Sequence, residues 1–299
     1  MSDKIFVWAH NDLDGIACCL LAKWAHPEDD FEYASTSAPN FRLDFTRWLL
    51  KNKVTDYNTI YILDLDVSEH KDLIDDEHFC IVDHHNSHVL NRDYKKAEAV
   101  IENYSSAAKL FYKNLTSMYC DFQLTPQQKM FVLLADDYDS YKLQIEDSTK
   151  LNSIFWATQN NFETFFDMYI KGFNGFTTQQ EAILRIYNEE LKKILDDLTF
   201  FENEEISINT KKYHFVSTFA NKYIDKVSDY ILDTYKPDVA VVVNLKMNRV
   251  SFRRSAESDI DLGELAKLIA NGGGHAYAAG GEVTEDFLSL CKKFKPRKK

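Results

Sequence analysis

Four short clusters of carboxylate and imidazole side chains are the part of this sequence best suited to chemistry. They are His10-Asn11-Asp12-Leu13-Asp14-Gly15, Asp64-Leu65-Asp66, Asp83-His84-His85 and Asp136-Asp137-Tyr138-Asp139. Each cluster alone has an ordinary interpretation as a helix cap, a loop start or a solvated helix end. Together they offer oxygen and imidazole ligands without cysteine, which suits manganese, magnesium, iron or cobalt better than a structural zinc. Two such ions sharing one aspartate would favour an in-line displacement at phosphorus.

Three of these clusters directly follow apolar segments with the pattern of buried strands. The strands are expected at residues 4–9, 58–63 and 79–82, with a further strand at 31–34 and a helix at 41–51. Alternating strands and helices predict an α/β fold with a mainly parallel sheet. The carboxyl ends of parallel strands share one edge, where ligand sites form. We therefore expect clusters that are distant in sequence to converge in space.

The second half of the chain has a different pattern. A helix is expected after the Thr125-Pro126 cap, and a long amphipathic helix at 178–200 predicts a connector between domains. Strands return at 214–219, 239–245 and 249–253, the last two as a hairpin, and a helix follows at 262–270. We predict a catalytic domain over 1–177, a helical connector over 178–203 and a smaller C-terminal α/β domain over 204–299.

A glycine-rich segment lies near the C-terminus. Five of the nine glycines fall within residues 271–281, in the string NGGGHAYAAGG. Backbone without side chains can bring N–H groups close to phosphate oxygens, and His275 can donate as well. A tight structural turn is the alternative. Upstream, Arg253 and Arg254 end a strand and could bind the same ligand.

Composition and charge limit the partners. The formal net charge of the 299 residues is −12, whereas a protein that holds long nucleic acid needs a basic face. The acidity therefore favours small ligands and opposes long duplex nucleic acid. No apolar run approaches the roughly 18 residues of a membrane span, and no cleavable leader precedes the first strand. We expect a cytoplasmic protein that does not contact membranes.

The motifs in order resemble the DHH phosphoesterase family, in the branch that carries a DHH-associated domain with a GGGH motif. The strings are HNDLDG, LDLD, DHH, YDSY, SFRR and GGGH, and they span nearly the whole chain. HNDLDG and YDSY look most like the nano-RNase B type of oligoribonuclease. The resemblance implies that the active site lies in the cleft between the two domains.

The resemblance also implies roles for particular residues. The implied metal ligands are His10, Asp12, Asp14, Asp64, His84 and Asp139. Asp64 would bridge the two ions, with His10 and Asp12 on the first ion and Asp14 and His84 on the second. For the last ligand, Asp136 and Asp137 are rival alignments to Asp139.

The catalytic residues implied are His85, Asp64 and Asp83. His85 would face the scissile phosphate, and Asp83 would orient the histidines. The substrate would also be held by Gly273, Gly274, His275 and Arg253. The family commonly has serine where this chain has Arg254, which leaves open which arginine reaches the ligand.

The predicted function is a two-metal phosphodiesterase that uses Mn²⁺, with Mg²⁺ or Co²⁺ as substitutes, and hydrolyses short oligonucleotides to mononucleotides. The same motifs fit a phosphodiesterase of cyclic dinucleotides or a phosphatase of phosphoadenosine phosphate. A third alternative, from another class, is a nucleotide-binding protein without catalysis. A homodimer is one assembly that the sequence allows.

Overall fold

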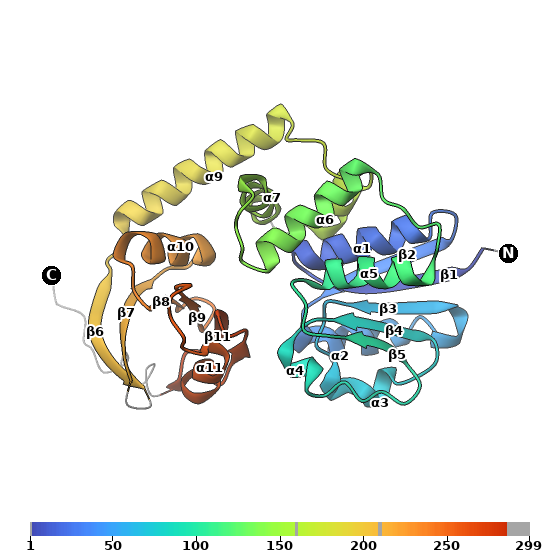
Figure 1. The fold of residues 1–299 in the computed structure, drawn as a ribbon, viewed down its shortest axis with the longest axis horizontal. Coiled ribbons are helices and arrows are strands. Elements are labelled where there is room, and N and C mark those ends of the chain that lie inside the picture. The colour runs from blue at the N-terminus through green and yellow to red at the C-terminus, as the bar shows by residue number, and fades with distance from the viewer. Residues whose placement is uncertain (1, 159–160, 209–210, 286–299) are drawn as a thin grey trace. The chain divides into compact units, whose positions relative to one another are not determined.

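The computed structural model describes residues 2–158, 161–208 and 211–285 (Figure 1). The chain divides into two compact units, Met1–Tyr187 and Asn188–Lys299, here called the N-terminal and C-terminal units. The division falls inside helix α9 (Thr178–Asp197), in the segment expected to connect two domains. No helix in the described ranges has both the length and the apolar character needed to cross a bilayer.

The N-terminal unit is built on a five-stranded parallel sheet. Its strands are β1 (Lys4–His10), β2 (Asp30–Thr36), β3 (Thr59–Leu63), β4 (Phe79–Asp83) and β5 (Glu98–Ile101). Their order across the sheet is β2-β1-β3-β4-β5. The predicted parallel α/β architecture is confirmed. β5 was not predicted, because it is a short edge strand with mostly exposed side chains and lacks an apolar run.

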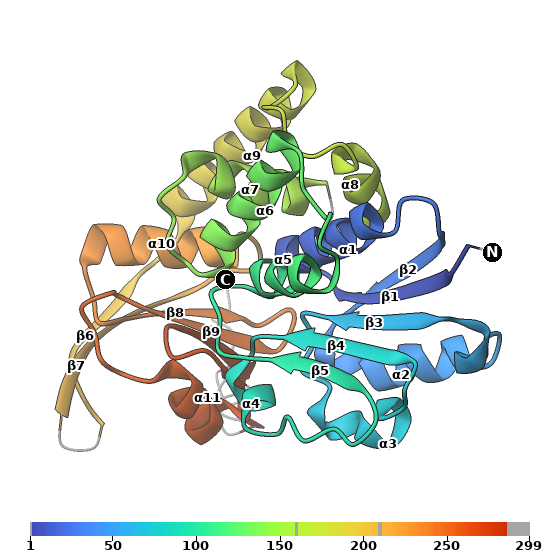
Figure 2. The same ribbon diagram turned by 45° about the vertical axis from the view of Figure 1, so that its right-hand side comes forward.

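Helices cover both faces of this sheet (Figures 1 and 2). One face is packed by α1 (Leu13–Ala25), α5 (Ala107–Met118), α6 (Pro126–Asp139), α7 (Glu146–Ala157) and α8 (Phe162–Tyr169). The other is packed by α2 (Ala38–Leu49) and α3 (Lys71–Ile74). Side chains along β1 alternate between the two cores, Val7 to the first and Trp8 to the second, as the period of a strand requires. Short turns complete the unit at Val54–Asp56, Ser68–His70 and α4 (Asn86–Val89).

The C-terminal unit contains a six-stranded mixed sheet. Its strands are β6 (Phe201–Ile208), β7 (Lys211–Phe219), β8 (Val239–Asn244), β9 (Arg249–Arg254), β10 (Gly273–Gly274) and β11 (Ala278–Glu282), in the order β10-β11-β9-β8-β7-β6. Helix α11 (Leu262–Ala270) packs with Val239 on one face, and α10 (Ile224–Tyr235) packs with Ala240 and Val242 on the other. The predicted hairpin of β8 and β9 is present.

The glycine-rich segment is not simply a loop in this sheet. Gly273 and Gly274 form β10, which pairs with β11, and β11 pairs in turn with β9. The pairing brings the backbone strands so close that a Cβ on Gly272 would lie 1.9 Å from the carbonyl oxygen of Gly280. Part of the glycine content therefore serves close backbone packing, which is the structural alternative considered for this segment.

Candidate active site

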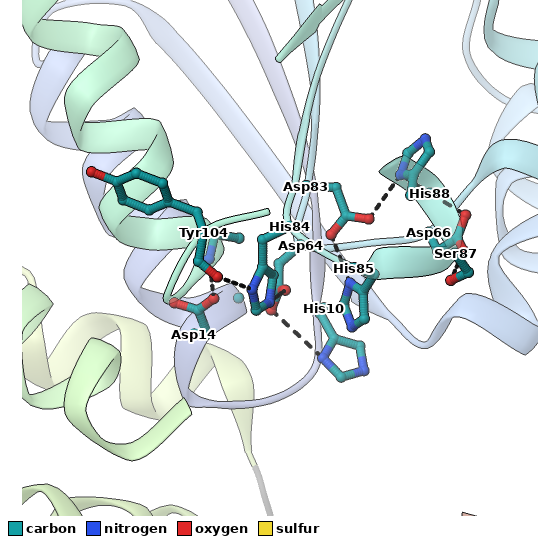
Figure 3. A network of polar contacts seen from close by, with 12 residues as sticks. His10, Asp14, Asp64, Asp66, Asp83, His84, His85, Ser87, His88 and Tyr104 are labelled. Carbon is teal, nitrogen blue, oxygen red and sulfur yellow. Dashed lines mark hydrogen bonds and ion pairs between the residues drawn. The ribbon is translucent and has the colours of Figure 1, made fainter. Parts of the chain in front are cut away.

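The polar clusters meet at the carboxyl edge of the parallel sheet, as expected. β1, β3 and β4 are neighbours in the sheet, and the side chains that follow them form interlocking groups (Figure 3). Among the described residues of the N-terminal unit, three groups have ligand atoms within 4.8 Å of one another: His10 with Asp12 and Asp64, Asp14 with Asp64 and His84, and Asp64 with Asp83 and His85. Asp64 is common to all three groups, so it occupies the centre of the cluster.

The first group is fixed by the turn from β1 into α1. His10 Nδ1 lies 2.6 Å from Asp12 Oδ2 and 3.7 Å from Asp64 Oδ2. The other oxygen of Asp12 accepts a hydrogen bond of 3.0 Å from Gly15 N and so caps α1. A Cβ on Gly15 would lie 2.0 Å from the carbonyl oxygen of His10, so the turn requires glycine. The HNDLDG string thus folds its imidazole and carboxylate toward one point.

His84 links the second group. Its Nε2 lies 3.5 Å from Asp64 Oδ1 and 3.5 Å from Asp139 Oδ2, while its Nδ1 donates to the carbonyl oxygen of Tyr104 at 3.3 Å (Figure 3). That backbone bond assigns the proton to Nδ1 and leaves Nε2 for a cation, the usual arrangement of a metal-binding histidine.

Asp14 is held by the start of another helix. Its two oxygens accept hydrogen bonds from the backbone N–H groups of Ala107 (2.7 Å) and Ala108 (3.1 Å), in the first turn of α5. The partial positive charge of a helix N-terminus favours a carboxylate there. α5 therefore fixes the orientation of Asp14 beside Asp64 and His84.

The three aspartates at the end of α6 have different surroundings. Asp139 lies beside His84. Asp136 bonds to the side chains of Ser105, Lys109 and Lys142. Asp137 accepts bonds from Gln144 N, Ile145 N and Ser148 Oγ and so organises the turn into α7. Only Asp139 of the three contacts the central cluster through a bond or ion pair recorded for the described residues.

Two buried oxygens of this cluster have no hydrogen-bond partner among the described residues, Asp64 Oδ2 and Asp139 Oδ2. Asp64 also has φ of 60°, a left-handed backbone conformation that costs energy for a residue other than glycine. Buried carboxylate oxygens without partners are costly in a protein interior. Bound divalent cations would compensate them, and the oxygen and imidazole donors fit such ions.

The charges of the cluster lead to the same conclusion. Burial raises the pKa of Asp64 and Asp139 well above the usual range, and the nearby Asp14 carboxylate raises both further. Burial likewise raises the pKa of Asp14 to about 6. For His10, burial lowers the pKa, but the Asp12 carboxylate outweighs it and raises the value to about 9. Closely packed buried carboxylates repel one another, and positive charge between them would relieve that repulsion.

Asp83 lies beneath the histidines that follow it. Its side chain is fully buried at the end of β4, and its Oδ1 is 2.7 Å from His85 Nδ1. Burial by itself raises the pKa of Asp83, yet the His85 and His88 contacts lower it below its usual range. An ionised Asp83 accepts a hydrogen bond from Nδ1–H of His85, so Nε2 is the nitrogen on the opposite side of that ring.

In the C-terminal unit, the two adjacent arginines have different partners. The Arg254 guanidinium donates to the backbone carbonyl oxygens of Ser258 and Ile260, so it closes the loop before α11. Arg253 donates to Asp225 Oδ1 at 2.6 Å, in the first turn of α10, and to the carbonyl oxygen of Phe252 at 2.9 Å. The two bonds of Arg254 indicate that it stabilises its own loop.

Of the three glycines in the GGGH segment, the backbone requires Gly272 and Gly274 but not Gly273. Gly274 has φ of +139°, and a Cβ there would lie 2.6 Å from the carbonyl oxygen of Ala278. A Cβ on Gly273 would meet no atom within 4 Å among the described residues. The His275 ring stacks on the Tyr277 ring, with centroids 5.4 Å apart and planes within 5°.

Comparison with known proteins agrees with these motifs. Residues 209–295 match the model of the DHHA1 domain. Oligoribonuclease NrnB of Bacillus subtilis is 25% identical over 311 aligned residues, which cover 95% of this chain and 74% of that protein. This chain carries a DHHA1 domain and resembles DHH phosphoesterases over nearly its whole length. Its DHH motif is the segment 83–85, and its DHHA1 domain lies in the C-terminal unit.

Solved DHH structures share the fold. RecJ of Thermus thermophilus in complex with Mn²⁺ is similar with a TM-score of 0.64 and 11% identity, over 97% of this chain and 51% of that chain. A pGpG-specific phosphodiesterase from Vibrio cholerae is similar with a TM-score of 0.56 and 14% identity, over 97% of this chain and 96% of that one. These likenesses concern the fold, whereas the case for a divalent ion rests on the donor groups of the cluster itself.

One residue beside the DHH motif was missed by the sequence interpretation. His88 was given no role, yet its Nδ1 lies 2.7 Å from Asp83 Oδ2 and it is fully buried (Figure 3). The available signal was its spacing. His85 is the N-cap of the short helix α4, and one helical turn brings the side chain of His88 back toward Asp83.

Proposed function

We propose that this DHH protein is a two-metal phosphodiesterase that hydrolyses short oligonucleotides to mononucleotides, with Mn²⁺ as its preferred ion. The observation that carries the proposal is the central position of Asp64. Its carboxylate belongs both to the group of His10 and Asp12 and to the group of Asp14 and His84. One aspartate shared by two ligand sets is the arrangement that a pair of ions requires.

The residues of the cluster have separate tasks in this proposal. His10 and Asp12 would hold one ion, Asp14, His84 and Asp139 would hold the other, and Asp64 would serve both. When bound, such ions supply an acidified water and neutralise charge on the phosphate oxygens. Burial lowers the pKa of His85, but the Asp83 carboxylate outweighs it and raises the value to about 9, so the ring carries a proton on both nitrogens. His85, oriented by Asp83, then donates from Nε2 to a non-bridging phosphate oxygen and stabilises the charge that develops during attack.

The DHHA1 domain holds the substrate in this proposal. Arg253, Gly273, Gly274 and His275 would bind its far phosphate or sugar. Gly273 supports this assignment because the described structure gives it no packing reason to lack a side chain. A bare backbone at that position allows close approach by a phosphate. Arg254 is left out of the binding set because its guanidinium is bonded to carbonyl oxygens of its own loop.

Short linear substrates are favoured over long ones by two observations. The net charge of −12 opposes the many phosphates of a long polymer. The Bacillus relative is named an oligoribonuclease, and the similar Vibrio structure is a phosphodiesterase of the dinucleotide pGpG. Linear RNA of a few nucleotides is therefore the substrate class that we propose.

A product assay tests the proposal. The purified protein with Mn²⁺, and a parallel sample with excess chelator, is offered a dinucleotide, a pentanucleotide and a long RNA, together with cyclic di-AMP and phosphoadenosine phosphate. We expect chelator-sensitive release of mononucleotides, fastest from the short RNAs. If only cyclic di-AMP or phosphoadenosine phosphate is hydrolysed, that compound would replace short RNA as the proposed substrate. No turnover of any of them would contradict the catalytic function and favour a nucleotide-binding role.

A further inference from the structure

His88 is a buried histidine with both ring nitrogens engaged, on the side of Asp83 away from the metal ligands (Figure 3). Its Nδ1 is 2.7 Å from Asp83 Oδ2, and its Nε2 is 2.7 Å from the Tyr94 hydroxyl. Asp66 Oδ1 is more distant from Nδ1, at 3.9 Å. Asp83 is therefore the principal acceptor for His88.

The partners determine where the protons lie. An ionised carboxylate only accepts hydrogen bonds, so both rings that contact Asp83 carry a proton on Nδ1, His85 on one oxygen and His88 on the other. His88 in its neutral form then accepts at Nε2 from the Tyr94 hydroxyl. The result is one chain of hydrogen bonds from Tyr94 through His88 and Asp83 to His85.

A buried histidine between an aspartate and a tyrosine is not in itself a sign of function. The same unit contains His26, which is also buried, with Nδ1 3.0 Å from Asp29 Oδ2 and Nε2 3.0 Å from the Tyr61 hydroxyl. No bond recorded for the described residues links Asp29 to a residue of the metal cluster. His88 differs from His26 because the second oxygen of its aspartate holds His85.

We propose that His88 is a positioning residue for His85. By occupying Oδ2 of Asp83, it fixes the rotation of that carboxylate and directs Oδ1 to His85 Nδ1. The His85 ring is thereby held with Nε2 as the nitrogen that acts on the substrate. The proposal rests on the role of His85 in the proposed function, and Tyr94 supports it from the far end of the chain.

Two substitutions of His88 separate this role from simple packing. The amide of asparagine reaches about as far as Nδ1 and can still donate to Asp83, whereas the amide of glutamine reaches about as far as Nε2. We expect His88→Gln to lower kcat by about 10- to 100-fold with little change in KM, as for other outer-shell partners of metal sites. His88→Asn should recover a clear part of that loss. Equal loss in the two variants, or a loss confined to KM, would overturn the proposal.

A double-substitution cycle tests whether His88 acts through His85. His88→Gln is compared with the parent and, separately, with the His85→Ala background. We expect a large loss of kcat in the first comparison and little further loss in the second, because the residue to be positioned is absent. The same loss in both backgrounds would assign His88 a role independent of His85.

The matched control is His26→Gln, which removes the same kind of buried contact elsewhere in the unit. It should lower thermal stability without changing kcat, and an equal fall in its kcat would mean that any buried histidine produces the effect. If a His88 variant does not fold, Tyr94→Phe removes the outer bond alone. We expect a smaller fall in kcat for Tyr94→Phe than for His88→Gln. An unchanged kcat in Tyr94→Phe would contradict the supporting role of Tyr94.

A spectroscopic readout separates this proposal from the proposed function. Ring ¹⁵N shifts of His85, assigned with the His85→Asn variant, report which nitrogen is protonated and need no substrate. We expect Nδ1 protonation in the parent and in His26→Gln, with altered His85 shifts in folded His88→Gln. Unchanged His85 shifts would overturn the positioning role. An inactive parent with the expected shifts would instead count against the proposed function alone.

Discussion

At the scale of single residues, Asp64 combines a central position with a strained backbone. Its φ of 60° is tolerated by asparagine as well as by aspartate, so Asp64→Asn preserves the backbone and removes only the charge. We predict that this variant loses more than about 100-fold in kcat, because a neutral amide offers one acceptor oxygen where the charged carboxylate offered two to the pair of ions. The assay is turnover of short RNA at saturating Mn²⁺. Activity above one tenth of the parent would contradict the shared-ligand assignment.

Asp139 and Asp136 form a matched pair for testing the last ligand. Asp139 lies 3.5 Å from His84, whereas Asp136 is paired with Lys109 and Lys142. We predict that Asp139→Asn raises the Mn²⁺ concentration needed for half-maximal activity by at least about tenfold. Asp136→Asn should leave that concentration unchanged and only lower stability. The sequence alone left both residues open, because it shows their spacing but not the direction of their side chains.

The two arginines of β9, like these two aspartates, have different hydrogen-bond partners. Arg253 is bonded to the side chain of Asp225, and Arg254 to carbonyl oxygens of its own loop. We predict that Arg253→Ala raises KM for short RNA with kcat little changed. Arg254→Ala should lower the free energy of unfolding by about 1–3 kcal/mol, since carbonyl acceptors lose their partner. Steady-state kinetics and denaturant titration measure the two effects, and the reverse pattern would exchange their roles.

At the scale of elements, apolar runs predicted β1, β3 and β4 to within a residue or two, because a strand buried on both faces has few polar positions. Convergence of the clusters followed from the rule for parallel sheet edges. The pairing of β11 with β9 could not be predicted from the sequence, because glycine and alanine carry no strand pattern and the pairing depends on a distant partner. His88 was missed for a related reason, since its role depends on the one-turn helix α4.

The turn from β1 into α1 is the element whose geometry controls the first metal ligands. A Cβ at Gly15 would lie 2.0 Å from the carbonyl oxygen of His10, and Gly15 N donates to the side chain of Asp12, the N-cap of α1. We predict that Gly15→Ala destabilises the protein by about 1–3 kcal/mol and weakens Mn²⁺ binding, because the overpacked turn must shift. Gly175→Ala is the control, with φ of +82° and no atom within 4 Å of its Cβ among the described residues. Gly175→Ala should lower stability but leave Mn²⁺ binding unchanged. Equally weakened Mn²⁺ binding in this control would contradict a specific role of the turn at Gly15.

At the scale of the whole molecule, the ordered motifs predicted the resemblance to DHH phosphoesterases, although each string was weak alone. The motifs that form the site follow β1, β3 and β4, which are neighbours in one sheet. Their order along the chain therefore matches the order of these strands across the sheet. The return of strand patterns after residue 200 led us to predict domains over 1–177 and 204–299, and these bounds stay predictions, whereas the two compact units meet at residues 187 and 188. The partners of Arg253 and Arg254 were beyond sequence reasoning, since both arginines have the same side chain and adjacent positions.

Metal binding should be visible in the stability of the entire chain. The ligands of the cluster are buried carboxylates whose crowding disfavours the metal-free fold, and a ligand that binds only the folded state stabilises it. At Mn²⁺ one hundred times above its dissociation constant, the gain is about 2.7 kcal/mol. For the N-terminal unit, which contains the cluster, that gain corresponds to a rise of roughly 5–10 °C in the melting temperature. Differential scanning calorimetry with Mn²⁺ and with chelator measures the rise. The rise should shrink in Asp64→Asn and persist in Asp136→Asn, and its absence in the parent would mean that these carboxylates do not bind the ion.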